Sequence, residues 1–335
     1  MVRQNLWQEQ HLNFTKMQKN KKIIITGGYG FIGSRFVKAV YDKTNYEILV
    51  IDSITYAADF NRIPDRIKED IDRFRFLSKD ICDVTCEDLK GATYLVNFAA
   101  ESHVDNSITD GKPFIRSNIE GVFNLLQCGG GTVKKFIQIS TDEVYGDMYD
   151  LRGRQYADES FRLRPSSYYS ASKASADLLV QAAARTFGTP YIITRSCNNF
   201  GPGQHKEKFL PTIFDSIAND KDVPVYGDGL QSREWIHVDD NVEIILELVL
   251  SNVKDEIYNI GSGYHYKNIE LVNYIGECLG TKVKRVPVED RLGHDKVYRL
   301  NCKKVEGFLG ERVYQCLEGY LKDEAKGLQG TSNRS

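Results

Sequence analysis

A tyrosine and a lysine four positions apart, Tyr169 and Lys173, form a pair suited to proton transfer. If this segment is helical, both side chains lie on one face, and the ammonium group of Lys173 is near the phenol of Tyr169. A nearby positive charge stabilises the phenolate and lets the tyrosine remove a proton from a hydroxyl group. The same spacing also occurs on solvated helix faces, so the pair indicates a catalytic role only in combination with other motifs of the chain.

A glycine-rich turn near the start of the chain can hold a phosphate. The residues TGGYGFIG (26–33) follow the apolar run KIIIT (22–26) and fit both G-x-x-G-x-x-G and G-x-G-x-x-G. Glycines allow close approach to a pyrophosphate, and the N-terminal amides of a following helix point at the anion. Asp52 ends the next apolar run. In dinucleotide-binding folds, a carboxylate at this position binds ribose hydroxyls and repels a 2′-phosphate. We therefore predict that the chain binds NAD rather than NADP. The alternatives are that the glycines form a purely structural turn and that Asp52 only caps the end of a strand.

Two adjacent carboxylates follow another strand-like run, KFIQIS (135–140). Asp142 and Glu143 come directly after Thr141, and ligands bind at the carboxyl ends of strands in open α/β sheets. Hydride transfer needs only a hydroxyl group and a tyrosine, so an added acid and base indicate a further proton transfer, such as elimination of water. A solvated turn is the alternative interpretation.

The elements that must position these groups alternate along the chain. Short apolar runs predict buried strands, and amphipathic patterns between them predict helices. This alternation predicts an α/β fold with a doubly wound parallel (Rossmann) sheet, and the loop-rich texture after Arg195 predicts a smaller C-terminal substrate lobe. The expected strands are 22–26, 47–52, 74–77, 94–98, 135–140 and 191–195, and the expected helices include 31–41, 115–127 and 170–187.

The same patterns suggest four parts of the chain. We expect an N-terminal extension over 1–20, an NAD-binding Rossmann domain over 21–195, and a substrate-binding lobe over most of 196–325. Some segments of the third part are expected to return to the Rossmann domain. The polar residues 326–335 are expected to form a frayed tail.

Composition excludes several classes of partner. The 335 residues carry a net charge of -2, which gives no overall attraction to nucleic acid or to an anionic membrane. The 7 cysteines form no C-x-x-C pair, so we expect free thiols and no metal site. No apolar run has the roughly 18 residues of a membrane helix, and we expect a soluble, cytoplasmic protein.

From 22 to 309 the sequence resembles the dTDP-glucose 4,6-dehydratases, which are extended short-chain dehydrogenases/reductases. Several blocks in the order of the family are far more specific than any single motif. The Asp142–Glu143 pair is the most distinctive feature, because related epimerases and decarboxylases usually carry other residues there. The matching blocks are TGGYGFIGS, NFAAESHVDNSI (97–108), STDEVYGD (140–147), YSASKASAD (169–177), RSCNNFGPGQ (195–204), EKFLP (207–211), VPVYGDGLQSREWIHVDD (223–240), YNIGSG (258–263) and DRLGHD (290–295).

The resemblance implies a role for each candidate catalytic residue. Tyr169, helped by Lys173 and Thr141, would remove the C4 hydroxyl proton of a nucleoside-diphospho-glucose while NAD accepts the C4 hydride. Glu143 would then remove the C5 proton, and Asp142 would protonate the departing C6 hydroxyl group. Return of the hydride to C6 would give a 4-keto-6-deoxy sugar, so NAD must stay bound throughout the cycle.

The resemblance also implies two sets of binding residues and a homodimer. Asn198, Lys208 and Arg233 match positions near the diphosphate, and Pro224 and Tyr226 match positions near the nucleobase. Thr141 completes the substrate set. The residues expected to bind NAD are Gly27, Gly30, Phe31, Ile32, Gly33, Asp52, Asp80, Ile81, Ala99, Tyr169 and Lys173.

Three alternatives remain at this level. A UDP-sugar C4 epimerase or a UDP-glucuronate decarboxylase would share the glycine turn and the Tyr/Lys pair, and a non-catalytic NAD-binding regulator could use the same fold. The sequence leaves open whether the substrate carries dTDP or UDP. The chain departs from the family after Leu309, where the usual tryptophan-proline pattern is missing, and in residues 1–20.

Overall fold

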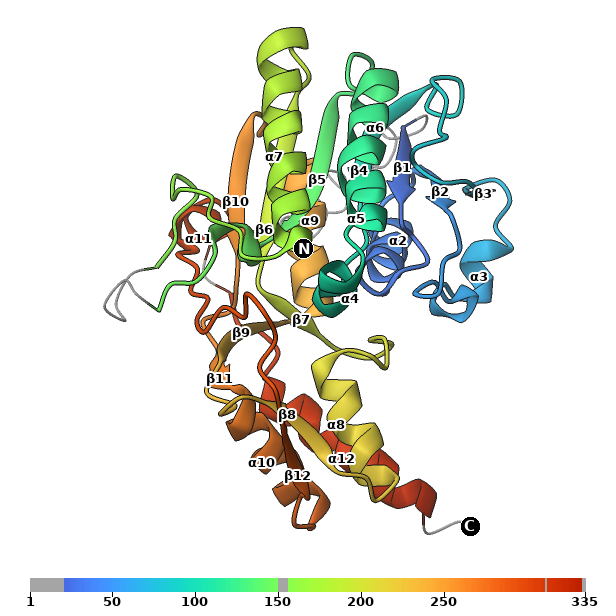
Figure 1. Ribbon diagram of the computed structural model, residues 1–335. Helices are drawn as coiled ribbons and strands as arrows, with labels where there is room; N and C mark the ends of the chain where they lie inside the picture. The colour runs from blue at the N-terminus through green and yellow to red at the C-terminus, as the bar shows by residue number, and fades with distance from the viewer. Residues whose placement is uncertain (1–20, 150–155, 311, 333–335) are drawn as a thin grey trace, which may run out of the picture.

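A seven-stranded sheet forms the centre of the larger lobe, at the top of Figure 1. The computed structural model describes residues 21–149, 156–310 and 312–332, so the expected extension over 1–20 lies outside the described residues. Every pair of neighbouring strands in this sheet is parallel, which confirms the predicted doubly wound Rossmann fold. In spatial order the strands are β3 (Phe74–Ser78), β2 (Glu47–Asp52), β1 (Lys22–Thr26), β4 (Ala92–Asn97), β5 (Lys135–Thr141), β6 (Tyr191–Ser196) and β10 (Glu256–Ile260).

Strand β1 shows why apolar runs become central strands. Ile23, Ile24 and Ile25 are all fully buried, although successive side chains of a strand point to opposite faces. Ile23 and Ile25 join the hydrophobic core on one face, and Ile24 joins the core on the other. A strand covered on both faces must be apolar throughout.

Helices cover both faces of the sheet. On one face lie α2 (Phe31–Lys43) and α9 (Val238–Leu250), and on the other lie α6 (Val122–Gly129) and α7 (Tyr168–Phe187). Both α9 and β10 come from the C-terminal half of the chain, which therefore contributes to the sheet. The shorter elements of this lobe are η1 (Phe60–Arg62), α3 (Asp65–Lys68), α4 (Val104–Thr109), α5 (Lys112–Ile115), η2 (Arg116–Gly121), η3 (Asp142–Tyr145) and α11 (Lys303–Leu309).

The smaller lobe lies below the sheet in Figure 1 and has its own core, which includes Phe200, Trp235 and Leu271. A three-stranded sheet in the order β11-β9-β7 and a parallel pair of β8 with β12 lie in this lobe. Its elements are β7 (Asn198–Phe200), α8 (Phe209–Ala218), β8 (Val223–Tyr226), β9 (Ser232–His237), β11 (His265–Lys267), α10 (Asn268–Leu279), β12 (Arg285–Val288) and α12 (Leu317–Ser332).

The C-terminal segment contains a helix that packs against the smaller lobe. Helix α12 runs to Ser332 and so includes part of the segment 326–335 whose fraying stays a prediction. Leu317, Leu321 and Ala325 recur every four residues and are buried, so the helix has an apolar stripe to hold it against the lobe. No helix in the described parts of the chain is long and apolar enough to span a membrane.

Candidate active site

The predicted tyrosine and lysine lie one turn apart in α7. Ser167 caps this helix, since its Oγ accepts a hydrogen bond from the backbone N–H of Ser170 over 3.1 Å. Tyr169 therefore lies in the first turn and Lys173 in the next, with exposed fractions of only 9% and 5%. The Lys173 ammonium group donates a hydrogen bond to the carbonyl oxygen of Ile139 over 2.5 Å, which ties α7 to β5.

Burial dominates the pKa values of this pair. It raises the pKa of Tyr169 above its usual range; the charge of Glu143 adds to this rise, and a hydrogen bond with Thr141 opposes it. Burial lowers the pKa of Lys173 to about 8, while the charge of Asp177 raises it. Burial thus favours a neutral phenol at rest.

Asp142 and Glu143 open η3 immediately after β5. The Thr141 hydroxyl accepts a hydrogen bond from the Glu143 N–H over 3.3 Å and donates one to Asp142 Oδ1 over 3.1 Å. Among the described residues, no partner binds the buried Oδ2 of Asp142, whose side chain is 2% exposed. Burial first, and then the charges of Glu143 and Glu234, raise the pKa of Asp142 well above its ordinary value. This environment favours a protonated Asp142.

Glu143 has different surroundings from its neighbour. Burial raises the pKa of its carboxyl group, but basic side chains on three segments of the chain after β7 oppose that rise. Lys208 precedes α8 and donates to the carbonyl oxygen of Ser102 over 2.9 Å, while Arg233 lies in β9 and is 6% exposed. The three basic residues are Arg291, Arg233 and Lys208. They favour the carboxylate form of Glu143.

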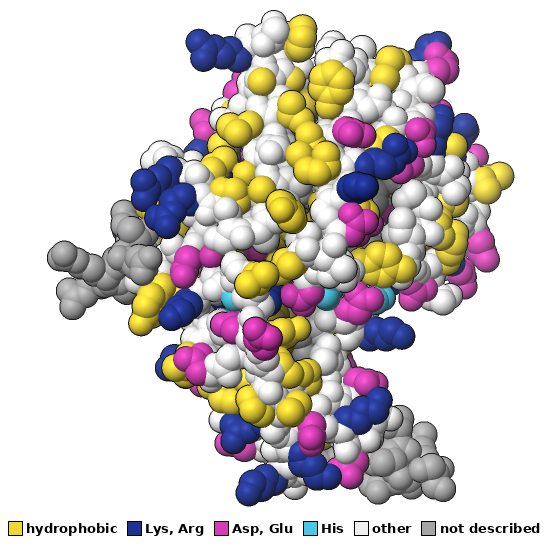
Figure 2. Space-filling view, viewed as in Figure 1, with side chains coloured by type: hydrophobic (Ala, Val, Ile, Leu, Met, Phe, Trp, Pro, Cys, Tyr) yellow, Lys and Arg dark blue, Asp and Glu magenta, His cyan; other side chains and the backbone are white. Residues whose placement is uncertain are grey.

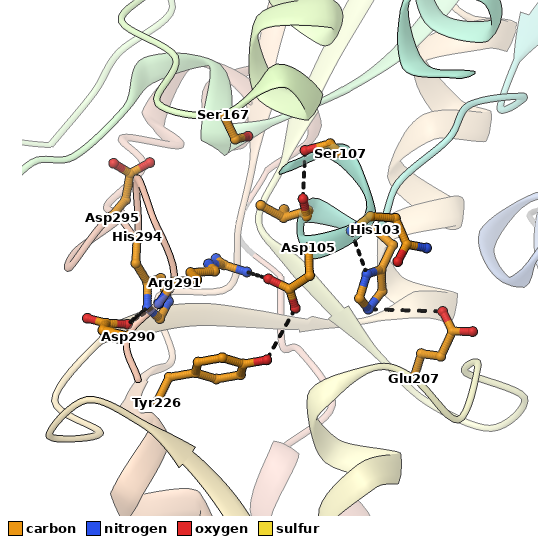
Figure 3. A network of polar contacts seen from close by, with 12 residues as sticks. His103, Asp105, Ser107, Ser167, Glu207, Tyr226, Asp290, Arg291, His294 and Asp295 are labelled. Carbon is orange, nitrogen blue, oxygen red and sulfur yellow. Dashed lines mark hydrogen bonds and ion pairs between the residues drawn. The ribbon is translucent and has the colours of Figure 1, made fainter. Parts of the chain in front are cut away.

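Asp105 connects the two lobes beside Arg291 (Figure 3). Its carboxylate lies 3.7 Å from Nη1 of Arg291 and accepts a hydrogen bond from the Tyr226 hydroxyl over 3.4 Å. Asp105 belongs to α4 in the upper lobe, whereas Tyr226 ends β8 and Arg291 follows β12. This network therefore links Tyr226, which is predicted to lie near the nucleobase, to Arg291, the charged residue with the largest effect on the pKa of Glu143. Asn198 opens β7 and Pro224 lies in β8 of the same lobe.

A groove of about 200 Å³ lies along the carboxyl ends of the sheet strands. At one end Asp52, which is 7% exposed, accepts hydrogen bonds from the backbone N–H groups of Tyr29 and Ile54, each over 2.9 Å. Six of the predicted cofactor residues line this groove: Gly27, Gly30, Asp52, Asp80, Ile81 and Ala99.

The glycine turn is close to the backbone after β4. Gly27 has a φ of 67°, and a Cβ atom there would lie 2.6 Å from the backbone nitrogen of Ala99. Gly33 packs against the carbonyl of Gly27, so it too has no room for a side chain. Phe31 and Ile32 begin α2 and pack their side chains against the core, so it is their backbone amides that can face a phosphate.

Two residues that hydrogen-bond to the lining of this groove were missed by sequence reasoning. Arg62 donates from Nη1 to the carbonyl oxygens of Tyr29 and Ala57, over 3.0 and 2.6 Å, and from Nε to that of Gly203 over 3.1 Å. It thereby joins the glycine turn, the segment after β2 and the smaller lobe. A lone arginine outside any motif carries no signal for such a role.

The second missed residue is Asn118, which is 1% exposed in the π-helical turn η2. Its Oδ1 accepts a hydrogen bond from the Glu101 N–H over 2.9 Å, and its Nδ2 donates to Ser172 Oγ over 2.8 Å. Asn118 therefore joins the groove wall to the residue that precedes Lys173. The irregular turn was the available signal, because π-helical turns are frequent at functional sites, but it is not visible in the sequence.

Known proteins resemble this chain in sequence over most of its length. The NAD dependent epimerase/dehydratase family matches residues 23–261. Relatives include the low-salt glycan biosynthesis protein Agl12 of Haloferax volcanii, 39% identical over 90% of this chain and 99% of that protein. The dTDP-glucose 4,6-dehydratase of Haemophilus influenzae is 36% identical over 91% of this chain and 96% of its own length.

Solved structures agree with the sequence relatives. DesIV, the dTDP-glucose 4,6-dehydratase of Streptomyces venezuelae determined with NAD bound, has a TM-score of 0.86 and 37% identity, covering 93% of this chain and 98% of its own. A UDP-glucuronic acid 4-epimerase of Bacillus cereus has a TM-score of 0.83 over 92% of this chain and 99% of its own, but at 24% identity it shows the fold alone. The chain belongs to the NAD dependent epimerase/dehydratase family, as its resemblance to the dTDP-glucose 4,6-dehydratases implied.

Proposed function

We propose that this chain is an NAD-dependent nucleotide-sugar 4,6-dehydratase, a hydro-lyase that converts dTDP-glucose or UDP-glucose to the 4-keto-6-deoxy sugar and water. The observation that supports this most strongly is the contrast between the adjacent carboxyl groups of Asp142 and Glu143. Burial and acidic neighbours raise the pKa of Asp142 well above its ordinary value, whereas basic neighbours oppose the rise that burial causes in the pKa of Glu143. An acid and a base beside Tyr169 are what elimination of water requires.

Each reacting group of the protein has one task. Tyr169, with the charge of Lys173 close by, removes the proton of the C4 hydroxyl group. Glu143 removes the C5 proton, which the C4 ketone makes acidic. Asp142 gives its proton to the departing C6 hydroxyl group, so that water leaves. NAD, when bound, supplies the hydride acceptor for C4 and the hydride donor for C6.

The residues of the groove fit this cofactor. Gly27 and Gly30 line the groove, and the N-terminal amides of α2 provide donors for a pyrophosphate. Asp52 lies at the carboxyl end of β2, where its oxygens can accept hydrogen bonds from ribose hydroxyls. The carboxylate also disfavours the 2′-phosphate of NADP. Arg62 would hold the segment after β2 over the ribose.

The three cations near Glu143 fit the diphosphate of the substrate. Arg291 has a buried Nε without a hydrogen-bond partner among the described residues. Like Arg291, Arg233 and Lys208 are close enough for their charges to lower the pKa of Glu143. Guanidinium and ammonium groups suit phosphate oxygens. Binding there would place the sugar between the smaller lobe and Tyr169. Asn198, Pro224 and Tyr226 would complete the nucleotide site.

The test is to incubate the purified protein separately with dTDP-glucose and UDP-glucose, without added NAD, and to measure loss of one water by mass spectrometry. We expect dehydration of at least one substrate, since NAD returns to its starting state in each cycle. The Glu143→Gln variant should retain NAD but stop exchange of the C5 proton with solvent. Persistent exchange at the original rate would exclude Glu143 as the base.

The same assay separates the alternatives. Inversion at C4 without loss of water would indicate an epimerase, and release of CO2 from UDP-glucuronate would indicate a decarboxylase. Absence of every reaction, with NAD supplied, would leave an NAD-binding regulator.

We also propose a homodimer that buries the outer face of the helices around α7. Figure 2 shows hydrophobic side chains gathered where Figure 1 draws α6 and α7. Exposed residues on this side include Phe123 and Leu178, at 52% and 57%. Phe123→Glu combined with Leu178→Glu should give a monomer in sedimentation experiments, whereas Ile71→Glu, at a more exposed site near α3, should not. A dimer in all three proteins would exclude this face. The cytoplasmic location stays a prediction.

A further inference from the structure

Two cysteine sulfur atoms approach each other closely on the upper lobe. Sγ of Cys86, in the segment 79–91 between β3 and β4, lies 2.7 Å from Sγ of Cys128 near the end of α6. This separation is shorter than the roughly 3.5 Å at which even smaller carbon atoms make contact. It is little longer than a disulfide bond of about 2.05 Å. A small movement would therefore bring the two sulfur atoms to bonding distance.

The two thiols differ in their access to solvent. Cys86 is exposed, and Cys128 is partly buried. Burial first, and then the interaction with Cys86, raises the pKa of Cys128 to about 11. Cys86 is therefore the thiol that a dissolved oxidant reaches first, and Cys128 is positioned to attack the sulfur of Cys86 afterwards.

The segment 79–91 also forms part of the cofactor groove. Asp80 and Ile81 line the groove, and the side chain of Asn124 on α6 donates hydrogen bonds of 2.8 Å to the carbonyl oxygens of Ile81 and Val84. The cysteine pair joins the same segment to the same helix. A covalent bond there would restrain the wall against which the dinucleotide lies.

We propose that Cys86 and Cys128 are a thiol modification site, which an oxidant of the glutathione-disulfide class converts reversibly to a disulfide that holds segment 79–91 against α6. The thiolate of Cys86 attacks the reagent, forms a mixed disulfide and releases one glutathione thiol. Cys128 then attacks Cys86 and releases the second. Two protein thiols are oxidised, the reagent is reduced to two thiols, and the two protons leave with these thiols. The consequence for cofactor retention rests on the proposed function.

The experiment treats the full-length protein with oxidised glutathione, alkylates the remaining thiols and digests with trypsin without reduction. Cleavage after Lys79, Lys90, Arg116 and Lys134 gives peptides 80–90 and 117–134, of which the second contains only Cys128. We expect a cross-link between these peptides that survives Cys82→Ser and is lost in Cys86→Ser. Cys316, exposed on the other lobe, serves as the control that gains glutathione without forming a cross-link.

Two further results decide the proposal. Glutathione retained on Cys86, or a cross-link through Cys82, would overturn it. The oxidised protein should melt roughly 5 °C higher than the reduced one and should release NAD several-fold more slowly, and a thiol reductant should reverse both changes. Equal release rates would overturn the link to the cofactor. Peptide mapping needs neither NAD nor sugar, so a protein that forms the cross-link but dehydrates neither substrate would contradict only the proposed function.

Discussion

The carboxyl groups of Asp142 and Glu143 are neighbours in the chain but differ in the charged groups that act on them most strongly. Asp142 is buried against acidic Glu143 and Glu234, with one oxygen atom lacking a partner among the described residues. Glu143 is half-buried, and its strongest charged neighbours are Arg291 and Arg233. Burial raises both pKa values, but acidic neighbours add to the rise at Asp142 and basic neighbours oppose it at Glu143, an asymmetry suited to a site that provides both an acid and a base.

Asp142→Asn should abolish proton donation to the C6 oxygen without harming the fold. We expect kcat for dehydration to fall by about 10²–10⁴-fold, with C5 proton exchange retained. Because burial raises the pKa of Asp142, the folded protein loses stability as the pH rises above 3.8, the ordinary pKa of this group. The variant avoids this loss, so its melting temperature should equal or exceed that of the wild type at pH 7, and the difference should shrink toward pH 4. Undiminished kcat would exclude Asp142 as the acid.

Arg291→Gln should shift the pH profile of dehydration. Arg291 lowers the pKa of Glu143, so its removal raises that pKa and protonates the base at a higher pH. The acidic limb of kcat should therefore move to higher pH, with a large loss of rate at pH 6 and a smaller one at pH 8. Arg285→Gln, an exposed substitution in β12, is the matched control. If wild type, Arg291→Gln and Arg285→Gln all had the same acidic limb of kcat, Arg291 would not control the pKa of Glu143.

Arg62→Gln should speed the loss of bound NAD. The guanidinium group holds Ala57 and Gly203 by hydrogen bonds of 2.6 and 3.1 Å, and a charged hydrogen bond contributes about 1.5–3 kcal/mol. We expect NAD release to become about 10-fold faster, since about 1.4 kcal/mol corresponds to that factor. The rate is measured after the NAD-loaded protein is diluted. Arg66→Gln, at an exposed position in α3, should leave the release rate unchanged. Unchanged release from Arg62→Gln would show that the contact with Gly203 does not retain the cofactor.

Lys135→Met should destabilise the fold. The buried ammonium group donates to the carbonyl oxygens of Leu248, Val249 and Ser251 over 2.9, 3.2 and 2.9 Å, and so caps the C-terminus of α9. We expect a loss of about 2–3 kcal/mol from the unpaired carbonyls, measured by urea unfolding against the exposed substitution Lys134→Met.

The effect of Lys135→Met should also depend on pH. Burial lowers the pKa of Lys135 to about 8 from 10.5. The folded protein therefore binds fewer protons than the unfolded chain between these values, and wild-type stability gains with pH there. The difference between wild type and variant should widen from pH 8 to pH 10. A constant difference would mean that the lysine keeps an ordinary pKa.

The sequence by itself determined the Rossmann fold and the chemical inventory of the site. Runs such as 22–26 and 191–195 are short, continuous and apolar, so their burial is a local property of the chain. The glycine turn and the order of Asp142, Glu143 and Tyr169 are also local. Strand β10 was not expected, because Glu256–Ile260 is short and partly polar, and only its pairing with β6 makes it a strand of the main sheet.

Only the tertiary structure decided how these residues differ from one another. The protonation preference of Asp142 depends on Glu234, 92 positions away in the chain (234 − 142), and the partners of Arg62 and Cys86 come from other elements. The physical reason is that burial, charge and hydrogen bonding act over a few ångströms in space. Sequence periodicity specifies which face of an element is buried, but not which distant side chain will lie against it.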